Sequence, residues 1–251
     1  MTVHVGTSGW GYGHWDGVLY PPGTRPPGRL EHYVRRFRTV ELNASFYRWP
    51  RTATFAGWQR RLPPGFQMSV KAPRGLTHAR KLYAPEEWIT RITAGLHELG
   101  DKRGVFLVQL APQQQRDDAR LEYFLDLLPG WVRTRTAVEF RHPSWHDDPV
   151  YDLLERRGVA YCVMSGARLP CVLRATAPVV YLRMHGPDDE HLYAGSYARD
   201  SLAWWADRIG EWTGQGREVY VYFNNDGEGN AVRDAETLCG LLPAAVSGRT
   251  C

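Results

Sequence analysis

The sequence has few cysteines and no long apolar run, and these absences exclude several classes of protein. Its four cysteines, Cys162, Cys171, Cys239 and Cys251, show no C-x-x-C spacing. This argues against a zinc module and a disulfide scaffold and predicts reduced thiols. No apolar run approaches the roughly 18 residues of a membrane helix, and the first residues lack a signal-peptide pattern. We therefore expect a cytoplasmic protein without a membrane partner.

Lysine is also scarce, because the 31 basic residues include only Lys71, Lys81 and Lys102. The net charge is +4, and no block of five or six basic residues occurs. Such a balance permits contact with a polyanion but does not require it. The glycines form neither a G-K-[ST] phosphate loop nor a dinucleotide fingerprint.

What the sequence does contain is a regular alternation of strand and helix patterns. With 43% apolar and 12% aromatic residues it can form a large core, which argues against disorder. Strands are expected at 3–8, 39–43, 66–71, 105–110, 136–141, 159–164, 179–185 and 219–225. Helical spacing occupies 29–37, 52–61, 85–98, 117–128, 149–157, 200–213 and 231–242.

Eight strands separated by helices over 251 residues predict an α/β fold: a TIM-like (β/α) barrel of eight parallel strands. The connection 165–178 between strands 6 and 7 is the exception. Pro170, Pro178 and its short length leave little room for a helix. No linker or internal repeat is evident, so we expect a single domain over residues 1–251.

Polar side chains gather toward the carboxyl ends of these strands. Alternation along each strand places them opposite an apolar set that helices would cover. In a barrel these ends meet at one mouth, where active sites lie. We expect this mouth to hold Glu41, Asn43, Lys71, Gln109, Glu139, Arg141, Arg183, His185 and Asn224. The alternative is a structural network in which, for example, Glu41 pairs with Arg183 or Glu139 with Arg141.

The loops after the strands add aromatic rings and a candidate phosphate site. Trp10, Tyr47 and Trp145 could stack a sugar or a base, although such rings also cover barrel rims. His142 lies beside Trp145 in the loop after strand 5. Asn225 ends the last expected strand, where barrels often bind phosphate, and Arg183 could add a bidentate contact.

Five segments resemble one known family. They are V-E-L-N-A-S-F-Y (40–47), K-A-P-R-G-L-T-H (71–78), V-E-F-R-H-P-S-W (138–145), Y-L-R-M-H-G (181–186) and Y-F-N-N-D (222–226), and the opening V-G-T-S-G-W (5–10) fits as well. Together they resemble domain-of-unknown-function family 72, the YecE-like proteins, from residue 3 to about residue 242.

The resemblance implies a barrel with a polar cleft at the strand ends and names no reaction. The shared motifs place at that cleft Glu41, Asn43, Lys71, His78, Glu139, Arg141, His142, Arg183, His185 and Asn224. Members of the family often carry an aspartate after strand 6. This sequence reads V-M-S-G at 163–166, which weakens any mechanism that needs a third carboxylate there.

Several functions remain open from the sequence. The first is an enzyme, a hydrolase or an isomerase/lyase, acting on a phosphorylated or phosphodiester substrate by carboxylate and histidine acid–base chemistry. The others are a glycoside hydrolase using Glu41 and Glu139, a Schiff-base enzyme using Lys71, and a non-enzymatic protein that binds single-stranded nucleic acid or a small ligand. No cofactor is predicted; one divalent ion on Glu41, Glu139 and His185 is the alternative.

The candidate residues divide into two groups. The catalytic candidates are Glu41, Lys71, Glu139 and His185. The substrate-binding candidates are Trp10, Asn43, Tyr47, His78, Gln109, Arg141, His142, Trp145, Arg183, Asn224 and Asn225.

Overall fold

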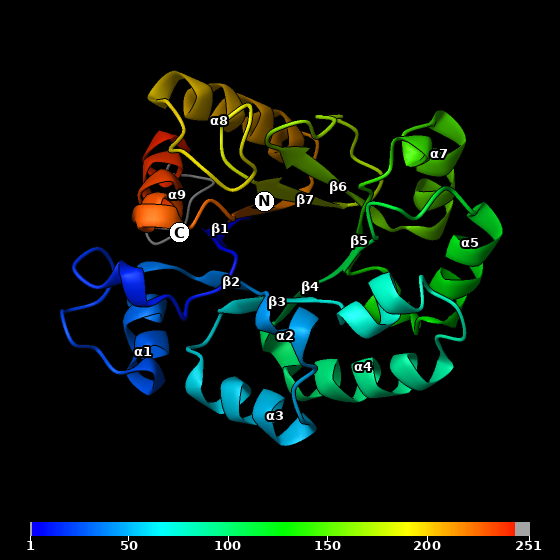
Figure 1. Cartoon of the computed structure of the whole chain (residues 1–251), viewed down its shortest axis with the longest axis horizontal. Helices are drawn as coiled ribbons and strands as arrows, with labels where there is room; N and C mark the ends of the chain where they lie inside the picture. Colours follow the sequence, from blue (N-terminus) through cyan, green and yellow to red (C-terminus); the bar gives the residue numbers. More distant parts are fainter. Residues whose placement is uncertain (1, 244–251) are drawn as a thin grey trace. The chain divides into compact units, whose positions relative to one another are not determined.

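The strands of the protein form one sheet of eight parallel strands, seen in a computed structural model that describes residues 2–243. Their order is β1-β8-β7-β6-β5-β4-β3-β2, and the sheet is a nearly closed, TIM-like barrel, as predicted (Figure 1). The strands are β1 (Val3–Thr7), β2 (Thr39–Leu42), β3 (Gln67–Lys71), β4 (Arg103–Gln109), β5 (Thr136–Glu139), β6 (Ala160–Ser165), β7 (Val179–Met184) and β8 (Glu218–Phe223).

Helices follow most of the strands. They are α1 (Pro26–Arg36), α2 (Ala44–Tyr47), α3 (Thr52–Arg61), α4 (Glu86–Glu98), α5 (Asp118–Leu127), α6 (Gly130–Arg133), α7 (Asp148–Arg157), α8 (Arg199–Gly214) and α9 (Asn230–Leu241). Short 3-10 turns cover Gly13–Trp15, Gly100–Lys102, Pro143–Trp145 and Gly227–Gly229, and a π-helix covers Gly75–Ala79. The predicted helix-poor connection is confirmed, because no helix lies between β6 and β7.

Backbone contacts divide the described chain into two compact units. Unit 1 comprises the described parts of 1–41, 163–173 and 180–251, and unit 2 comprises 42–162 and 174–179. In unit 1, α8 and α9 pack against each other, and both contact β8. In unit 2, α3 packs on α4 and α5 on α7. The expectation of a single domain over the whole chain stays a prediction.

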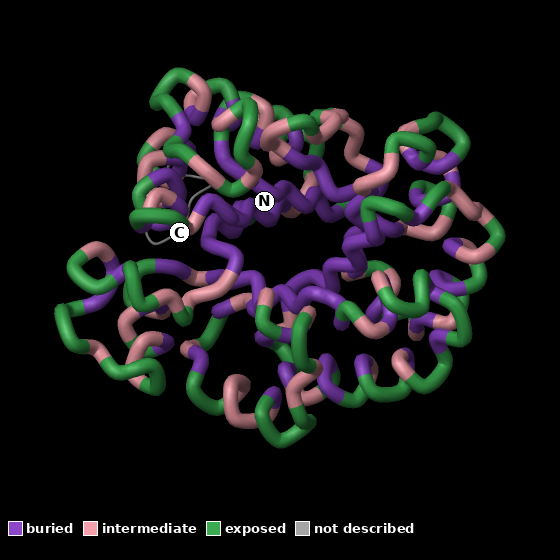
Figure 2. Tube along the Cα trace, viewed as in Figure 1, coloured by how far each residue is buried: buried purple, intermediate pink, exposed green. Residues whose placement is uncertain are grey.

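The core follows from the strand pattern. The strands are buried along almost their whole length, whereas the outer helices alternate buried and exposed positions (Figure 2). In unit 1 the polar faces of the last two strands carry tyrosines: the ring centroids of Tyr181 and Tyr222 are 5.3 Å apart, and Tyr220 stacks on His4 at 4.4 Å. The barrel strands therefore bury both apolar residues and hydrogen-bonding rings.

Local capping explains where α7 begins and ends. The Asp147 side chain accepts a hydrogen bond from the Asp148 amide at 3.0 Å, and Pro149 follows in the first turn, where its missing amide hydrogen costs nothing. Gly158 ends the helix in the left-handed conformation, with φ 64°. These signals place the start of β6 two residues later.

The structure bears on two expectations, the absence of a membrane helix and the presence of reduced thiols. No helix among residues 2–243 has the length and apolar character needed to cross a bilayer. Cys162 and Cys171 are not disulfide-bonded, but Cys239 takes part in a disulfide bond. The expectation of reduced thiols is therefore wrong at Cys239, and Cys251 lies outside the described residues.

Candidate functional site

In unit 1, the side chains of Glu41 on β2 and Arg183 on β7 form a buried ion pair. Arg183 on β7 donates from Nε to Oε2 of Glu41 at 2.9 Å and from Nη2 to Oε1 at 2.8 Å. Both side chains are completely buried. The two parallel contacts give the bidentate geometry that makes an arginine–carboxylate pair strong and directional.

Two hydroxyls complete the surroundings of Glu41. Ser8 donates to Oε1 at 2.5 Å, and Tyr181 donates to Oε2 at 2.7 Å. Burial and the Glu41 charge raise the pKa of Tyr181 well above its usual value, so its phenol remains a neutral donor. Each oxygen of Glu41 thus accepts two hydrogen bonds, and the carboxylate is occupied as a structural acceptor.

His185 and Asn224 lie side by side at the carboxyl ends of β7 and β8. Asn224 Nδ2 donates to His185 Nδ1 at 3.3 Å, and the imidazole is completely buried. The His185 backbone is fixed on both sides, by Ser165 O at 2.6 Å and by the Tyr193 amide at 2.6 Å. The structure therefore brings these two predicted residues together.

Asn225 points to a different partner. Its amide donates to Asp234 on α9 at 2.7 Å and to Gly195 O at 2.9 Å. Asp234 also accepts from Ser196 Oγ at 2.6 Å and from the Tyr197 amide at 3.0 Å. Asn225 thus joins the end of β8 to α9 and to the segment 195–197. This network gives Asn225 a role in holding the loop.

In unit 2, a second carboxylate is buried at the end of β5. Glu139 Oε1 accepts from Gln109 Nε2 at 2.6 Å and pairs with Arg141 Nε. The Cys162 thiol lies 3.9 Å from Oε2. Gln109 and Glu139 are also register partners in the β4–β5 ladder, so the strand pairing itself brings them together. The sequence analysis predicts Gln109, Glu139 and Arg141 at the ends of neighbouring strands.

Lys71, at the end of β3, packs against an aromatic ring. Its Nζ lies 4.2 Å from the centroid of Phe46, within the range of a cation–π contact. Phe46 lies in α2, and its ring meets His78 edge-on at 4.9 Å. Ser45 holds α2 to the strands, because its hydroxyl contacts Leu42 O at 2.7 Å and Lys71 O at 2.6 Å.

The π-helix Gly75–Ala79 carries His78 into this cluster. Such π-turns are rare in proteins, and those that occur are often found at functional sites. Gly75 allows Trp88 to pack closely against this turn, because a Cβ there would approach Trp88 Cζ2 to 2.6 Å. His78 Nδ1 lies 2.9 Å from the Thr77 hydroxyl. The unusual turn therefore fixes the direction of the imidazole.

The pKa of His78 reports the charge around it. Burial and the positive charges of Lys71, Arg74 and Arg141 lower it to about 4, and Glu139 acts in the opposite direction. A nearby cation disfavours the protonated imidazole, as does loss of solvent. His78 is therefore neutral at neutral pH, and unit 2 presents net positive charge to it.

The aromatic candidates differ widely in exposure. Trp145 is completely buried: it stacks on Phe140 at 4.8 Å and donates from Nε1 to Gln114 O at 2.8 Å. This corrects the expectation for Trp145, because neither face of its indole is left for a ligand. Tyr47 is 77% exposed, and Trp10 is partly exposed. His142 is also partly exposed, and its Nδ1 contacts Ser144 Oγ at 2.8 Å.

The candidates thus form two clusters, one in each unit. Glu41, Arg183, His185 and Asn224 belong to unit 1. Lys71, His78, Gln109, Glu139 and Arg141 belong to unit 2, with Asn43 and Tyr47. The expectation that all of them share one mouth stays a prediction. Within residues 2–243, no group of three or more His, Cys, Asp and Glu side chains is placed to hold a metal ion.

Four contributing residues were not among the sequence candidates: Ser8, Phe46, Arg74 and Tyr181. Strand alternation puts Tyr181 on the face of Arg183, and that signal could have identified it. Phe46 and Arg74 both stand inside the motifs that carry the family resemblance. Ser8 follows β1 directly and forms a parallel bridge with Glu41. Its role depends on that pairing, which no local pattern reveals.

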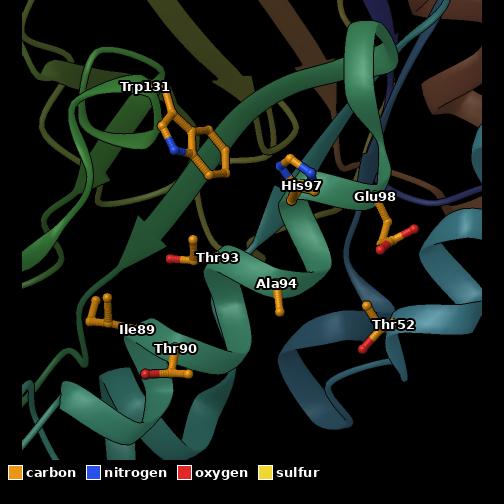
Figure 3. A pocket seen from close by; sticks show the side chains of 8 residues that line it. All are labelled: Thr52, Ile89, Thr90, Thr93, Ala94, His97, Glu98 and Trp131. Atoms are coloured by element: carbon orange, nitrogen blue, oxygen red, sulfur yellow. The ribbon is translucent and has the colours of Figure 1, made fainter.

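A separate depression lies on the outer helices of unit 2. It has a volume of about 630 Å³ and is lined by Thr52, Ile89, Thr90, Thr93, Ala94, His97, Glu98 and Trp131 (Figure 3). The indole of Trp131 points toward the end of α4 that carries His97. None of the predicted site residues lines it.

Comparison with known proteins agrees with this architecture. Residues 4–249 match the family "Protein of unknown function DUF72". The UPF0759 protein YunF of Bacillus subtilis is 27% identical, with 98% of this chain and 96% of that protein covered. A crystal structure of a DUF72 family protein from Thermotoga maritima has a TM-score of 0.86 at 28% identity, covering 96% of this chain and 99% of that one.

More distant structures share the fold alone. A DUF72 family protein from Enterococcus faecalis gives a TM-score of 0.79 at 20% identity, covering 96% of this chain and 95% of that one. A crystal structure of SacUVDE gives a TM-score of 0.56 at 11% identity, covering 96% of this chain and 99% of that one. Because one family match spans nearly the whole sequence, the chain belongs to the DUF72 family, whose function is unknown.

Proposed function

We propose that this protein is an enzyme acting on an anionic substrate, a phosphorylated compound or a phosphodiester, at the carboxyl ends of β3–β5 in unit 2. One observation carries the proposal: Lys71 and His78 pack on the same ring, Phe46, and the charges around His78 are three cations, Lys71, Arg74 and Arg141, against one carboxylate, Glu139. A half-buried place with such an excess of positive charge attracts and orients an anion.

The residues of this cluster can divide the work of binding and proton transfer. Lys71 and Arg141 would bind the anion, the arginine through its planar donors and the lysine as a point charge. Asn43 adds an acceptor, because its buried Oδ1 has no hydrogen-bond partner among the described residues. Glu139 would then accept a proton from the nucleophile as general base, and the neutral imidazole of His78 would orient the substrate through hydrogen bonds.

The Glu41 cluster supports a different role. All four hydrogen bonds to Glu41 would have to be rearranged before it could act as a base or nucleophile. A glycoside hydrolase using Glu41 and Glu139 is therefore less well supported than anion chemistry in unit 2. Glu41 and Arg183 are better explained as a stabilising ion pair.

Binding of inorganic phosphate, measured by isothermal titration calorimetry, tests the anion site. We expect the wild-type protein to bind phosphate and Lys71→Met to bind it at least tenfold more weakly, because a charge-assisted contact is lost. Lys81→Met is the matched control, since Lys81 is exposed. Absence of phosphate binding in the wild type, or equal affinity in Lys71→Met, would overturn the proposal.

Turnover of 4-nitrophenyl phosphate and bis(4-nitrophenyl) phosphate tests the catalytic part. Glu139→Gln keeps the shape of the side chain and removes its charge. We expect a rate loss on the order of 10²–10⁴-fold with phosphate affinity little changed, as for removal of a general base. If the wild type binds phosphate but cleaves neither ester, non-catalytic binding becomes the better interpretation.

A further inference from the structure

One aromatic ring beside the proposed anion site is directed to solvent. Tyr47 is 77% exposed, the largest fraction among the large apolar and aromatic side chains described as exposed. It is the last residue of α2, the short helix that begins two residues after β2 ends. An exposed ring at the end of a barrel strand is placed where ligands bind rather than where helices pack.

The ring of Tyr47 packs against the ring of Phe46. It meets Phe46 edge-on, with centroids 5.2 Å apart and planes at 89°. Phe46 in turn contacts Lys71 Nζ at 4.2 Å and the His78 ring at 4.9 Å. One ring thus connects the exposed tyrosine to the lysine and to the histidine. Because Ser45 fastens α2 to Leu42 O and Lys71 O, these groups keep a fixed relation.

A hydrogen-bond acceptor without a partner lies in the same turn. Oδ1 of Asn43 is buried and accepts no hydrogen bond from the described residues, while the Asn43 carbonyl accepts from the Phe46 amide at 3.1 Å. A buried acceptor left unsatisfied costs free energy, and a ligand N–H or O–H would relieve that cost. The exposed ring of Tyr47 and the buried Oδ1 of Asn43 could therefore both contact a part of the ligand other than its anionic group.

We infer that the anionic ligand of unit 2 is a nucleotide unit, with its phosphate among Lys71, Arg74 and Arg141 and its base stacked on Tyr47. The inference rests on the proposed function and adds the substrate class. A nucleotide joins a phosphate to a planar base through one sugar, which matches a lysine and an exposed ring separated by a single phenylalanine, Phe46. A free anion would leave Tyr47 unused, and a sugar phosphate has no planar base to cover the ring.

The source of the nucleotide unit is left to the experiment. A mononucleotide and a single strand present the same phosphate, sugar and base. A strand adds neighbouring phosphates, which contribute through counterion release and make binding strongly salt-dependent. Stacking of each base on an aromatic ring is tolerant of sequence, so either source would use Tyr47 in the same way.

Calorimetry with matched ligands isolates the base. Ribose 5-phosphate, adenosine 5′-monophosphate and a 12-nucleotide single-stranded oligodeoxyadenylate are titrated into the full chain. We expect the mononucleotide or the oligonucleotide to bind roughly tenfold or more tightly than ribose 5-phosphate, the effect of one stacked base. Tyr47→Ala should remove this advantage and leave ribose 5-phosphate affinity unchanged, while Tyr47→Phe should keep it.

The controls separate this inference from the proposed function. Tyr83→Ala removes another exposed tyrosine, one that packs on Arg120, and should keep the advantage of the base. No binding of ribose 5-phosphate or phosphate by the wild type would overturn the proposed function. Equal affinity for the sugar phosphate and both base-containing ligands, or an equal loss for all three in Tyr47→Ala, would overturn the nucleotide inference alone.

Discussion

The two units bury charge in different ways. In unit 1, Glu41 accepts four hydrogen bonds from Ser8, Tyr181 and Arg183 in a completely buried pair. In unit 2, three cations act on the half-buried His78, and Tyr47, which packs on Phe46, is exposed. A polar side chain at a strand end can therefore be structural or can face a ligand. The donors that a carboxylate already receives help to distinguish the two roles.

The largest difference should follow from breaking the Glu41–Arg183 pair. Arg183→Met leaves the Glu41 carboxylate buried without its counter-charge, and removing one partner of a buried pair costs about 3–5 kcal/mol. Urea denaturation followed by circular dichroism measures the free energy of unfolding. Arg174→Met is the control, since Arg174 pairs with the exposed side chains of Asp148 and Asp152, and should cost at most about 1 kcal/mol.

Equal losses in these two variants would contradict the view that unit 1 uses its charges for stability. If Arg183→Met were as stable as the wild type, the pair would contribute nothing net. The strand-end charges of unit 1 would then need a functional explanation of their own.

A smaller loss is expected when a single donor to Glu41 is removed. Tyr181→Phe keeps the ring packed against Tyr222 and deletes only the hydroxyl 2.7 Å from Oε2. A hydrogen bond to a charged group contributes roughly 1.5–3 kcal/mol, and we expect a loss in that range by the same denaturation measurement.

Tyr123→Phe is the matched control for Tyr181→Phe. Tyr123 also donates to a carboxylate, Glu86, at 2.5 Å, but it is 51% exposed, and water can replace the lost hydroxyl. Its loss should therefore be clearly smaller. If the two phenylalanine variants lost equal stability, burial would not be what distinguishes the Glu41 cluster.

The fold was predictable because its signals are local. Strand alternation, helical spacing and Pro170 and Pro178 were enough to indicate eight strands and the helix-poor connection before β7. Alternation also put Tyr181, Arg183 and His185 on one face. The helix α3 occupies Thr52–Arg61, the range that helical spacing predicts.

The roles of the site residues were less predictable, because they depend on distant partners. Glu41 and Arg183 are 142 positions apart, so the sequence could offer their pairing only as an alternative. Trp145 lies in the loop after a strand, and such loops are usually exposed. Its indole is nevertheless buried against Phe140, in a space that only the folded chain creates. The π-turn that carries His78 packs Trp88 closely on Gly75, a contact that no hydrophobic period records.

The smallest expected effect is a change in the pKa of His78 in unit 2. Proton chemical shifts of the histidine rings, followed by NMR, should give a pKa of about 4 for His78. Lys71→Met should raise this pKa toward the ordinary 6.5, because one of the cations that disfavour the imidazolium is gone. Lys81→Met should leave it unchanged, and saturating phosphate should raise it in the wild type, because the anion compensates the positive charge.

The same shift fixes the direction of the pH dependence of stability. The pKa of His78 is lower in the folded chain than in the unfolded chain, so between pH 6.5 and about 4 the unfolded chain binds more protons. His78 therefore lowers the free energy of unfolding as the pH falls through this window, and Lys71→Met should reduce that dependence. A measured pKa near 6.5 in the wild type would mean that the cations do not act on His78, and the contrast between the two units would disappear.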